Sequence, residues 1–137
     1  MPRGTVAPLP SARRILVIED DDDGREALCV LLESYGYAVR GVDGGQAGVF
    51  ATLAWQPDAV CIDLGLPDMS GLMVAQVLSA AFDRRRRPFL VAVTGYGSPE
   101  DRQRALAAGF DVVLVKPVDP NEIDAVLDDG PARGPNS

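Results

Sequence analysis

Five polar residues at the ends of apolar runs have the chemistry to bind a metal ion and receive a phosphoryl group. Glu19 and Asp20 follow the run ILVI, and Asp63 follows AVCI. Thr94 follows FLVAV, and Lys116 follows VVLV. Magnesium prefers a few carboxylates together with water and phosphate oxygens. Because a carboxylate can act as a nucleophile while a hydroxyl and an ammonium neutralise charge on the transferring oxygens, these residues predict metal-assisted phosphoryl transfer.

The apolar runs that these residues terminate predict a parallel sheet. Short aliphatic runs lie near residues 14–18, 38–42, 59–62, 89–93 and 111–115, and each is suited to a buried strand. Helical patterns separate the runs, and this alternation implies right-handed crossovers with helices on both faces of the sheet. Ligands of an open parallel sheet bind outside the carboxyl ends of the strands. We therefore expect the five residues to converge there.

The helical patterns also predict boundaries and buried sides. A first helix is expected to end at Gly36, and a third covers roughly residues 70–82. The fourth is predicted to begin at the N-cap Ser98, with proline at its first position, and to end at Gly109. The second covers about residues 45–54, and its apolar residues predict the side that faces the sheet. These residues are Phe50, Leu53 and Ala54.

The domain boundaries follow from the same pattern. Residues 1–12 contain three prolines and a glycine without periodicity and are expected to form a flexible lead,. Residues 13–129 are predicted to form one domain, since a chain of 137 residues is long enough for a single core,. The fifth helix is expected to be short, and residues 130–137 to be a tail.

The composition excludes other chemistries. The chain has no histidine, which removes imidazole catalysis, imidazole metal sites and donation of a phosphoryl group from histidine,. A net charge of −7 argues against direct nucleic-acid binding,, and the basic run Arg84 to Arg87 indicates a solvated loop. Cys29 and Cys61 are expected to be free buried thiols. With no signal peptide or membrane-spanning run, a cytoplasmic location without membrane contact is expected.

The sequence around the lone aspartate resembles a known family. Asp63 lies in CIDLGLPDMSG, which follows ILVIEDD and precedes AVTGYG and LVKP. Together and in this order, these motifs resemble the response-regulator receiver family of two-component signalling, from about Arg14 to Leu127. The resemblance implies a doubly wound, flavodoxin-like α/β fold with five parallel strands in the order 2-1-3-4-5.

The resemblance also implies a role for each site residue. Asp63 would be the phospho-acceptor, taking the phosphoryl group from a phosphohistidine on a histidine kinase or histidine phosphotransfer protein. Asp20, Asp63 and the main-chain carbonyl of Gly65 would ligate Mg2+, and Glu19 would act mostly through metal-bound water. Thr94 would bond a phosphoryl oxygen. Lys116 would pair with the phosphoryl group, or with Asp63 before reaction, and the Lys116–Pro117 peptide bond would be cis.

The chain departs from the family pattern at several positions. Glu19 replaces the commoner aspartate, and Gly95 stands where many members have alanine or serine. Val113 occupies a position where the family often has tyrosine or phenylalanine, whose ring moves inward on phosphorylation. Valine cannot make that movement, so another read-out is expected. Tyr96, two residues after Thr94, is predicted either to cover the site and slow hydrolysis or to be an exposed loop residue.

Three other classes of protein fit the sequence less well. An aspartyl-phosphate hydrolase of the haloacid dehalogenase type uses similar groups, but here Gly24 stands at the deciding position after Asp20-x-Asp22, and there is no room for a cap domain. A calcium-binding EF-hand would need a glutamate at Val30. A dinucleotide-binding domain would need a Gly-x-Gly-x-x-Gly motif after a strand. We expect a signalling switch without separate turnover, either stand-alone or part of a hybrid sensor kinase, that an unknown downstream protein reads.

Overall fold

The computed structural model describes residues 12–133 as five strands alternating with five helices. The strands are β1 (Arg14–Ile18), β2 (Ala38–Val42), β3 (Ala59–Asp63), β4 (Phe89–Thr94) and β5 (Val112–Val115). The helices are α1 (Asp22–Ser34), α2 (Gly45–Trp55), α3 (Gly71–Ala81), α4 (Pro99–Ala108) and α5 (Pro120–Arg133). Two parts of the chain lie outside the described residues. They are residues 1–11, which belong to the predicted lead, and residues 134–137, which belong to the predicted tail.

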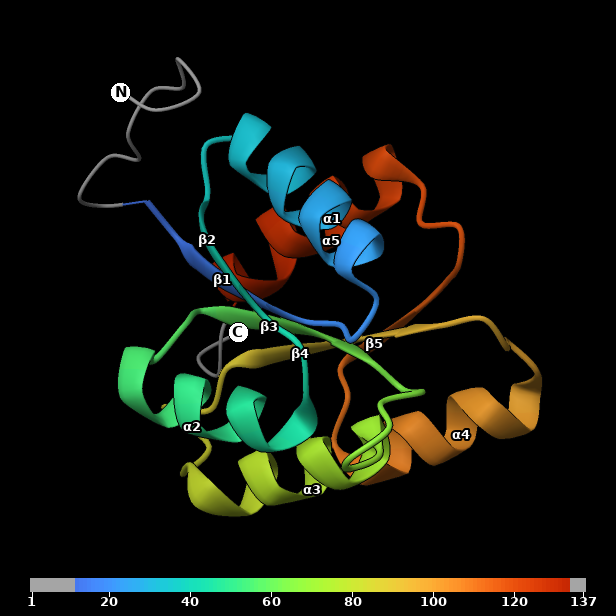
Figure 1. Ribbon diagram of the computed structural model, residues 1–137. Coiled ribbons are helices and arrows are strands. Elements are labelled where there is room, and N and C mark those ends of the chain that lie inside the picture. The colour runs from blue at the N-terminus through green and yellow to red at the C-terminus, as the bar shows by residue number, and fades with distance from the viewer. Residues whose placement is uncertain (1–11, 134–137) are drawn as a thin grey trace.

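The five strands form one parallel sheet in the order β2-β1-β3-β4-β5, as predicted (Figure 1). All residues of β3 are buried, because this strand is central and covered on both faces. Its neighbours β1 and β4 are buried at every residue except the first of each. These are the aliphatic runs of the sequence, and the order puts the ends of β1, β3, β4 and β5 side by side.

Two helical layers cover the sheet. In Figure 1, α1 and α5 lie above it, and α2, α3 and α4 lie below. The strand side chains alternate between these layers. On the side of α1 and α5, Ile15, Val17 and Cys61 pack with Leu32 and Ile123. The opposite cluster is built from the other strand side chains and the apolar residues of α2 to α4, among them Leu16, Ile18, Ile62, Val74, Leu78, Ala105 and Val113.

The ends of α3 and α4 are set by local chemistry. The hydroxyl of Ser98 accepts a hydrogen bond from the amide of Asp101 at 3.1 Å, and Pro99 begins α4. Gly109 ends α4 with φ of 116°, a left-handed conformation that glycine adopts without strain,. The hydroxyl of Ser70 accepts from the amide of Met73 at 3.2 Å at the start of α3. The predicted limits of α4 are therefore confirmed.

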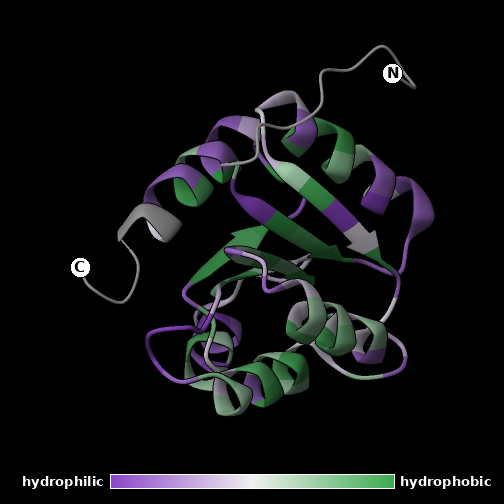
Figure 2. Cartoon of the chain, turned by 90° about the vertical axis from the view of Figure 1, so that its left-hand side faces the viewer, coloured by the Kyte–Doolittle hydropathy of each residue, from purple (hydrophilic) through white to green (hydrophobic). Residues whose placement is uncertain are grey.

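The predicted buried side of α2 is wrong. Phe50 is 73% exposed and Leu53 is 44% exposed, and Ala54 is exposed as well. The side that faces the sheet is instead made of Gly45, Gly48 and Thr52. A Cβ atom at Gly48 would come within 2.2 Å of Ile18 Cδ1, so the helix lies too close to β1 for larger side chains. Figure 2, which brings this part of the molecule to the front, shows α2 mostly in green and white.

The fifth helix is longer than expected. It runs from Pro120 to Arg133 and therefore continues beyond residue 129, where the domain was predicted to end. Gly130 is buried within it, and a Cβ atom there would meet the Phe89 ring at 2.4 Å. Glycine is thus needed for close packing against β4 rather than for a flexible tail. Among the described residues, no helix is both long and apolar enough to cross a membrane.

Candidate phosphoryl-transfer site

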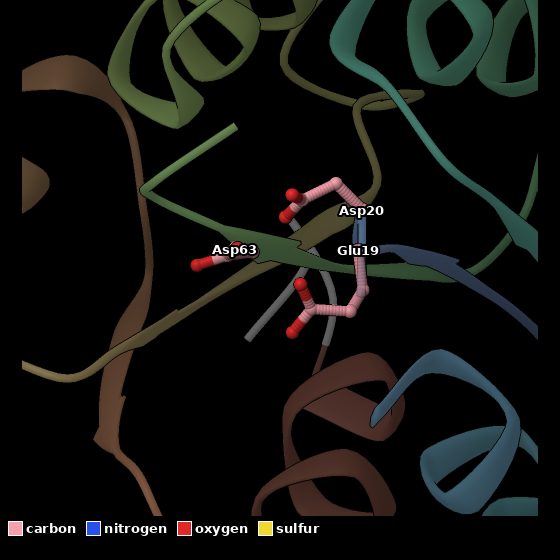
Figure 3. Close-up of side chains that lie close together, drawn as sticks. All are labelled: Glu19, Asp20 and Asp63. Carbon is pink, nitrogen blue, oxygen red and sulfur yellow. The ribbon is translucent and has the colours of Figure 1, made fainter. Parts of the chain in front are cut away.

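Three carboxylates gather at the carboxyl ends of β1 and β3. Figure 3 shows Glu19 and Asp20 at the end of β1 beside Asp63, the last residue of β3. One carboxylate oxygen from each lies within 4.8 Å of the other two. Glu19 and Asp63 are buried, whereas Asp20 is exposed. The acids that the sequence placed at separate strand ends therefore share one small space.

Lys116 supplies the positive charge at this cluster. Its Nζ atom donates to Glu19 Oε1 at 2.8 Å and forms an ion pair with Asp63 Oδ1 at 3.5 Å. Lys116 is the only lysine of the chain, and its peptide bond to Pro117 is cis, as the family resemblance implied. The predicted pairing with Asp63 is present, but Glu19 is the nearer partner, so one ammonium bridges two buried carboxylates.

The protonation of this pair reflects burial and charge together. Burial raises the pKa of the Glu19 carboxyl, an effect that the hydrogen bond from Lys116 opposes. Burial favours the neutral amine of Lys116, but its hydrogen bond to Glu19 and the negative charge of Asp63 raise the pKa of this amine above its usual range. Lys116 therefore keeps its charge and balances part of the acidic cluster.

The backbone after Asp63 holds its carboxylate. The amide of Gly65 donates to Asp63 Oδ1 at 3.1 Å, and the amide of Leu64 donates to Val93 O at 3.2 Å. A Cβ atom at Gly71 would lie 2.6 Å from Asp63 O and 2.7 Å from Leu64 Cα, so only glycine fits there. The spacing of Asp63 and Gly71 thus has a steric cause. The carbonyl of Gly65 stays a predicted metal ligand.

A pocket opens beside Asp63. It has a volume of about 280 Å³ and is lined by Asp63, Leu64, Gly65, Ser70, Leu72, Thr94, Gly95, Tyr96, Asp101 and Arg104. Thr94 is buried at the end of β4, and its Oγ1 atom accepts a hydrogen bond from the amide of Tyr96 at 3.0 Å. The threonine hydroxyl is still able to donate its own hydrogen. Asp63 and Thr94 therefore line a space large enough for a phosphoryl group.

Tyr96 and Val113 lie at different depths. Tyr96 is 78% exposed at the rim of the pocket, which leaves both of its predicted roles open.

Val113 is buried on the α4 side of the sheet, in the same cluster as Ala105 and Ala108 of α4. Small and branched side chains thus fill this part of the core between β5 and α4. The structure therefore holds β5 directly against α4.

Two residues that sequence reasoning did not identify support the loops of the site. Arg25 donates to the main-chain oxygen of Glu19 at 2.9 Å and to Asp22 Oδ1 at 2.6 Å. The carboxylate of Asp68 accepts from the amides of Gly45 at 2.9 Å and Gln46 at 3.1 Å. These bonds lower the pKa of Asp68,. Because Arg25 follows Glu19 by only six positions, its contact with Glu19 could have been expected from the sequence. The contacts of Asp68 with Gly45 and Gln46 join segments that are far apart in sequence, so no local pattern indicates them.

The donor set fits a hard divalent cation. All three clustered groups are carboxylates, and oxygen ligands are the ones that Mg2+ and Ca2+ accept,. Three acids facing one ammonium leave a local excess of negative charge. The exposure of Asp20 leaves water free to complete the shell of a bound ion, and Mg2+ usually retains several waters,.

The other acids of the run after β1 have separate roles. Asp21 caps α1 by accepting from the amide of Gly24 at 2.8 Å, and Asp22 pairs with Arg25. Asp22 and Asp23 lie in the first turn of α1, where negative charge suits the helix dipole,. Cys61 is buried in β3, and burial raises the pKa of its thiol to about 12, while Cys29 is half-buried. Arg84, Arg85 and Arg86 are exposed, as predicted for the basic loop, and Arg87 pairs with Asp111 at 2.6 Å.

Comparisons with known proteins agree with this fold and site. The family profile described as "Response regulator receiver domain" matches residues 15–128. The phosphate regulon transcriptional regulatory protein PhoB of Klebsiella pneumoniae is 38% identical over 115 residues, which are 83% of this chain and 49% of PhoB. The cell cycle response regulator CtrA of Brucella ovis is 32% identical over 112 residues, 82% of this chain and 47% of CtrA. The chain thus spans about half the length of these relatives.

Solved structures give the same result. A CheY-like response regulator receiver domain from Methylobacillus flagellatus has a TM-score of 0.74 and 32% identity, and the match covers 86% of this chain and 98% of that one. A second, from Methanospirillum hungatei, has a TM-score of 0.81 and 27% identity over 89% of this chain and 95% of that one. The chain belongs to the response regulator receiver domain family.

Proposed function

We propose that this receiver domain accepts a phosphoryl group on the carboxylate of Asp63 from a phosphohistidine of a partner protein. The observation that supports this most directly is the setting of Asp63. Its carboxylate lies beside the Lys116 ammonium and two further acids, and Asp63 also lines a pocket together with Thr94. A nucleophile, a fixed cation, a hydroxyl donor and a set of metal ligands thus surround one small volume.

The reaction forms one bond and breaks one. A carboxylate oxygen of Asp63 attacks phosphorus, the phosphorus–nitrogen bond of the phosphohistidine breaks, and the imidazole leaves with its electron pair and takes up a proton. The product is an acyl phosphate on Asp63. Thr94 is positioned to donate to a phosphoryl oxygen, and Lys116 to exchange part of its contact with Glu19 for one with the phosphoryl group,. Hydrolysis by water then restores the carboxylate and releases phosphate.

Magnesium is the proposed cofactor. Asp20, Asp63 and the carbonyl of Gly65 would hold it, with Glu19 acting through water,. When bound, the ion would neutralise negative charge on the phosphoryl oxygens. The residues present can hold such a cation and leave the nucleophilic carboxylate facing the pocket. We propose that the domain undergoes phosphorylation and dephosphorylation without turning over a separate substrate.

The output is proposed to pass through β4, β5 and α4. The amide of Lys116 donates to Thr94 O at 2.7 Å, so the end of β5 is tied to the end of β4. Val113, on the same strand, packs with α4. A shift of Thr94 toward a phosphoryl group would therefore be felt by α4 through backbone and packing, without an aromatic ring at position 113. A ligand that favours one of two arrangements shifts their populations.

Three settings suit such a domain. It acts alone, as part of a hybrid sensor kinase, or as the receiver portion of a longer regulator such as the PhoB and CtrA relatives, one of which is named as a transcriptional regulatory protein. In each, the partner is a histidine kinase or histidine phosphotransfer protein in the cytoplasm. A downstream protein or domain reads the state, and this domain itself contacts neither nucleic acid nor membrane.

The test is phosphoryl uptake measured by intact mass. The protein is incubated with Mg2+ and phosphoramidate, or with a phosphorylated histidine phosphotransfer protein, and compared with Asp63→Asn. Asp68→Asn is the matched control, because it removes a carboxylate from the same loop but not from the cluster. The wild type and Asp68→Asn should gain one phosphoryl group and Asp63→Asn none. Equal uptake by Asp63→Asn, or no uptake by the wild type from either donor, would contradict the proposal.

A further inference from the structure

Two charged residues of α4 line the pocket beside Asp63. They are Asp101 and Arg104, which stand three residues apart on the helix. The Nη1 atom of Arg104 lies 3.7 Å from Asp101 Oδ1. Among the described residues that line this pocket, Arg104 alone is basic. The pocket therefore places a cation that the proposed phosphoryl transfer does not use in the same lining as the acceptor.

The ion pair that holds Arg104 is a weak one. The Arg104 side chain is 70% exposed and that of Asp101 34% exposed, and exposed pairs on a helix contribute little to stability. Their separation of 3.7 Å is longer than the distance of about 2.7–2.9 Å typical of a charge-assisted hydrogen bond,. Arg87, by contrast, binds Asp111 at 2.6 Å. The guanidinium of Arg104 can therefore leave Asp101 for a stronger partner.

Phosphorylation would supply such a partner. Before the reaction, the charged residues of the pocket lining are the acids Asp63 and Asp101 and the guanidinium of Arg104. A phosphoryl group carries a charge of roughly −1.5 to −2 near neutral pH, more than a single carboxylate. The planar fork of arginine also matches two phosphate oxygens at once. A phosphoryl group in this pocket would therefore attract Arg104 more strongly than Asp101 does.

The backbone that carries Arg104 is packed against the sheet. Ala105, the next residue of α4, is fully buried in the same core cluster as Val113 of β5. The polar side of α4 thus lines the pocket through Asp101 and Arg104, and the buried side meets β5. A new contact of the Arg104 guanidinium therefore acts on the helix that the proposed output uses.

We propose that Arg104 binds the phosphoryl group on Asp63 and gives up its contact with Asp101 when it does so. The inference rests on the proposed phosphorylation of Asp63. Lys116 follows β5 and pairs with Asp63, whereas Arg104 belongs to α4. Two cations from different elements then hold the phosphoryl group, and α4 responds to it directly as well as through β5.

The rate of phosphoryl uptake gives the first test. Arg104→Gln is compared with Arg102→Gln, because Arg102 is exposed on α4 but does not line the pocket. Both variants remove one positive charge from the same helix. With phosphoramidate and Mg2+, the second-order rate constant for uptake, followed by intact mass, should fall about fivefold in Arg104→Gln, as expected for one exposed charged pair. It should stay near the wild-type value in Arg102→Gln. Arg104→Lys should recover part of the rate, since it restores the charge but not the fork.

The NMR signal of the arginine side chain gives the second test. The Nε–H resonance of Arg104 is assigned by its loss in Arg104→Gln, and that of Arg102 by its loss in Arg102→Gln. When excess phosphoramidate keeps the wild type phosphorylated, the Arg104 resonance should shift and the Arg102 resonance should not. In Asp63→Asn, at the same phosphoramidate concentration, neither resonance should shift.

The outcomes separate this inference from the proposed function. An Arg104 resonance that stays in place while the mass shows phosphorylation would overturn the inference, and so would equal uptake rates in Arg104→Gln and Arg102→Gln. Either result leaves Asp63 as the acceptor. A wild type that takes up no phosphoryl group would overturn both proposals.

Discussion

The guanidinium of Arg25 hydrogen-bonds to the main-chain oxygen of Glu19 at 2.9 Å. Its other arm binds Asp22 at 2.6 Å, so one side chain ties the end of β1 to the first turn of α1. The segment between these points carries Glu19 and Asp20. We infer that Arg25 is a positioning residue for the proposed metal ligands, because it fixes the backbone that carries them,.

Arg25→Lys should weaken Mg2+ binding. The substitution keeps the positive charge but loses the planar fork that reaches two acceptors at once. Loss of such supporting contacts typically costs about tenfold or more in metal affinity, and isothermal titration calorimetry measures this change. Arg40→Lys, on β2 and stacked over Trp55, is the matched control and should leave affinity unchanged. An unchanged affinity in Arg25→Lys would show that Arg25 only stabilises the helix start.

Lys116→Gln should lower both phosphoryl uptake and stability. Without the ammonium, the Glu19, Asp20 and Asp63 carboxylates repel one another, and the pKa of Glu19 should rise further,. Because the Lys116 side chain is 39% exposed, we expect a loss of only about 1 kcal/mol in unfolding free energy,. Urea denaturation with and without Mg2+ measures it, and Mg2+ should recover part of the loss. A variant as stable as the wild type in the absence of Mg2+ would contradict this account.

Gly71→Ala should distort the acceptor loop. The added methyl would meet backbone atoms of Asp63 and Leu64, which cannot rotate away as a side-chain end could. Such overpacking typically costs about 1–3 kcal/mol, and phosphoryl uptake should fall with it. Gly65→Ala is the comparison, since its methyl would come no closer than 3.8 Å to an Asp63 side-chain oxygen. Gly65→Ala should retain more stability in thermal unfolding, and the reverse order would refute the steric argument.

Asp68 should make the start of α2 sensitive to acid. Its pKa is lowered because the carboxylate accepts from the amides of Gly45 and Gln46. A lowered pKa in the folded state stabilises the protein above the unfolded pKa of about 4, and that contribution is lost as pH falls through the folded value. Asp68→Asn should therefore melt below the wild type at neutral pH, and the difference should shrink below about pH 4. A difference that stays constant with pH would exclude ionised Asp68 as the cause.

Tyr96→Ala is predicted to shorten the lifetime of the acyl phosphate. Tyr96 lies at the rim of the pocket beside Thr94, where its ring can restrict the approach of water. Decay of the phosphorylated protein, followed by intact mass, measures the lifetime. Leu106→Ala is the control, because Leu106 is exposed on α4 but does not line the pocket. An unchanged lifetime in Tyr96→Ala would count against the covering role and favour an exposed loop tyrosine.

The strands and the residues at their ends could be predicted because buried parallel strands are continuous aliphatic runs. The side of α2 that faces the sheet could not be predicted, because apolar residues occur all round this helix and their spacing does not single out one side. The length of α5 could not be predicted, because a glycine such as Gly130 normally indicates a helix end, whereas here it lies within the helix and packs against Phe89. The order of the Lys116 contacts depends on distances of 2.8 and 3.5 Å that no sequence spacing encodes.

The hydrogen bond between Lys116 and Glu19 joins residues 97 positions apart. The acidic cluster and its ammonium partner are therefore assembled from the ends of β1, β3 and β5, the first, third and last strands along the chain. A domain generally folds as one unit, and a chain that has β1 and β3 but not yet β5 would hold Asp63 without its ammonium partner. If Asp63 is the acceptor as proposed, competence to accept a phosphoryl group would thus arise only when the whole domain has been made.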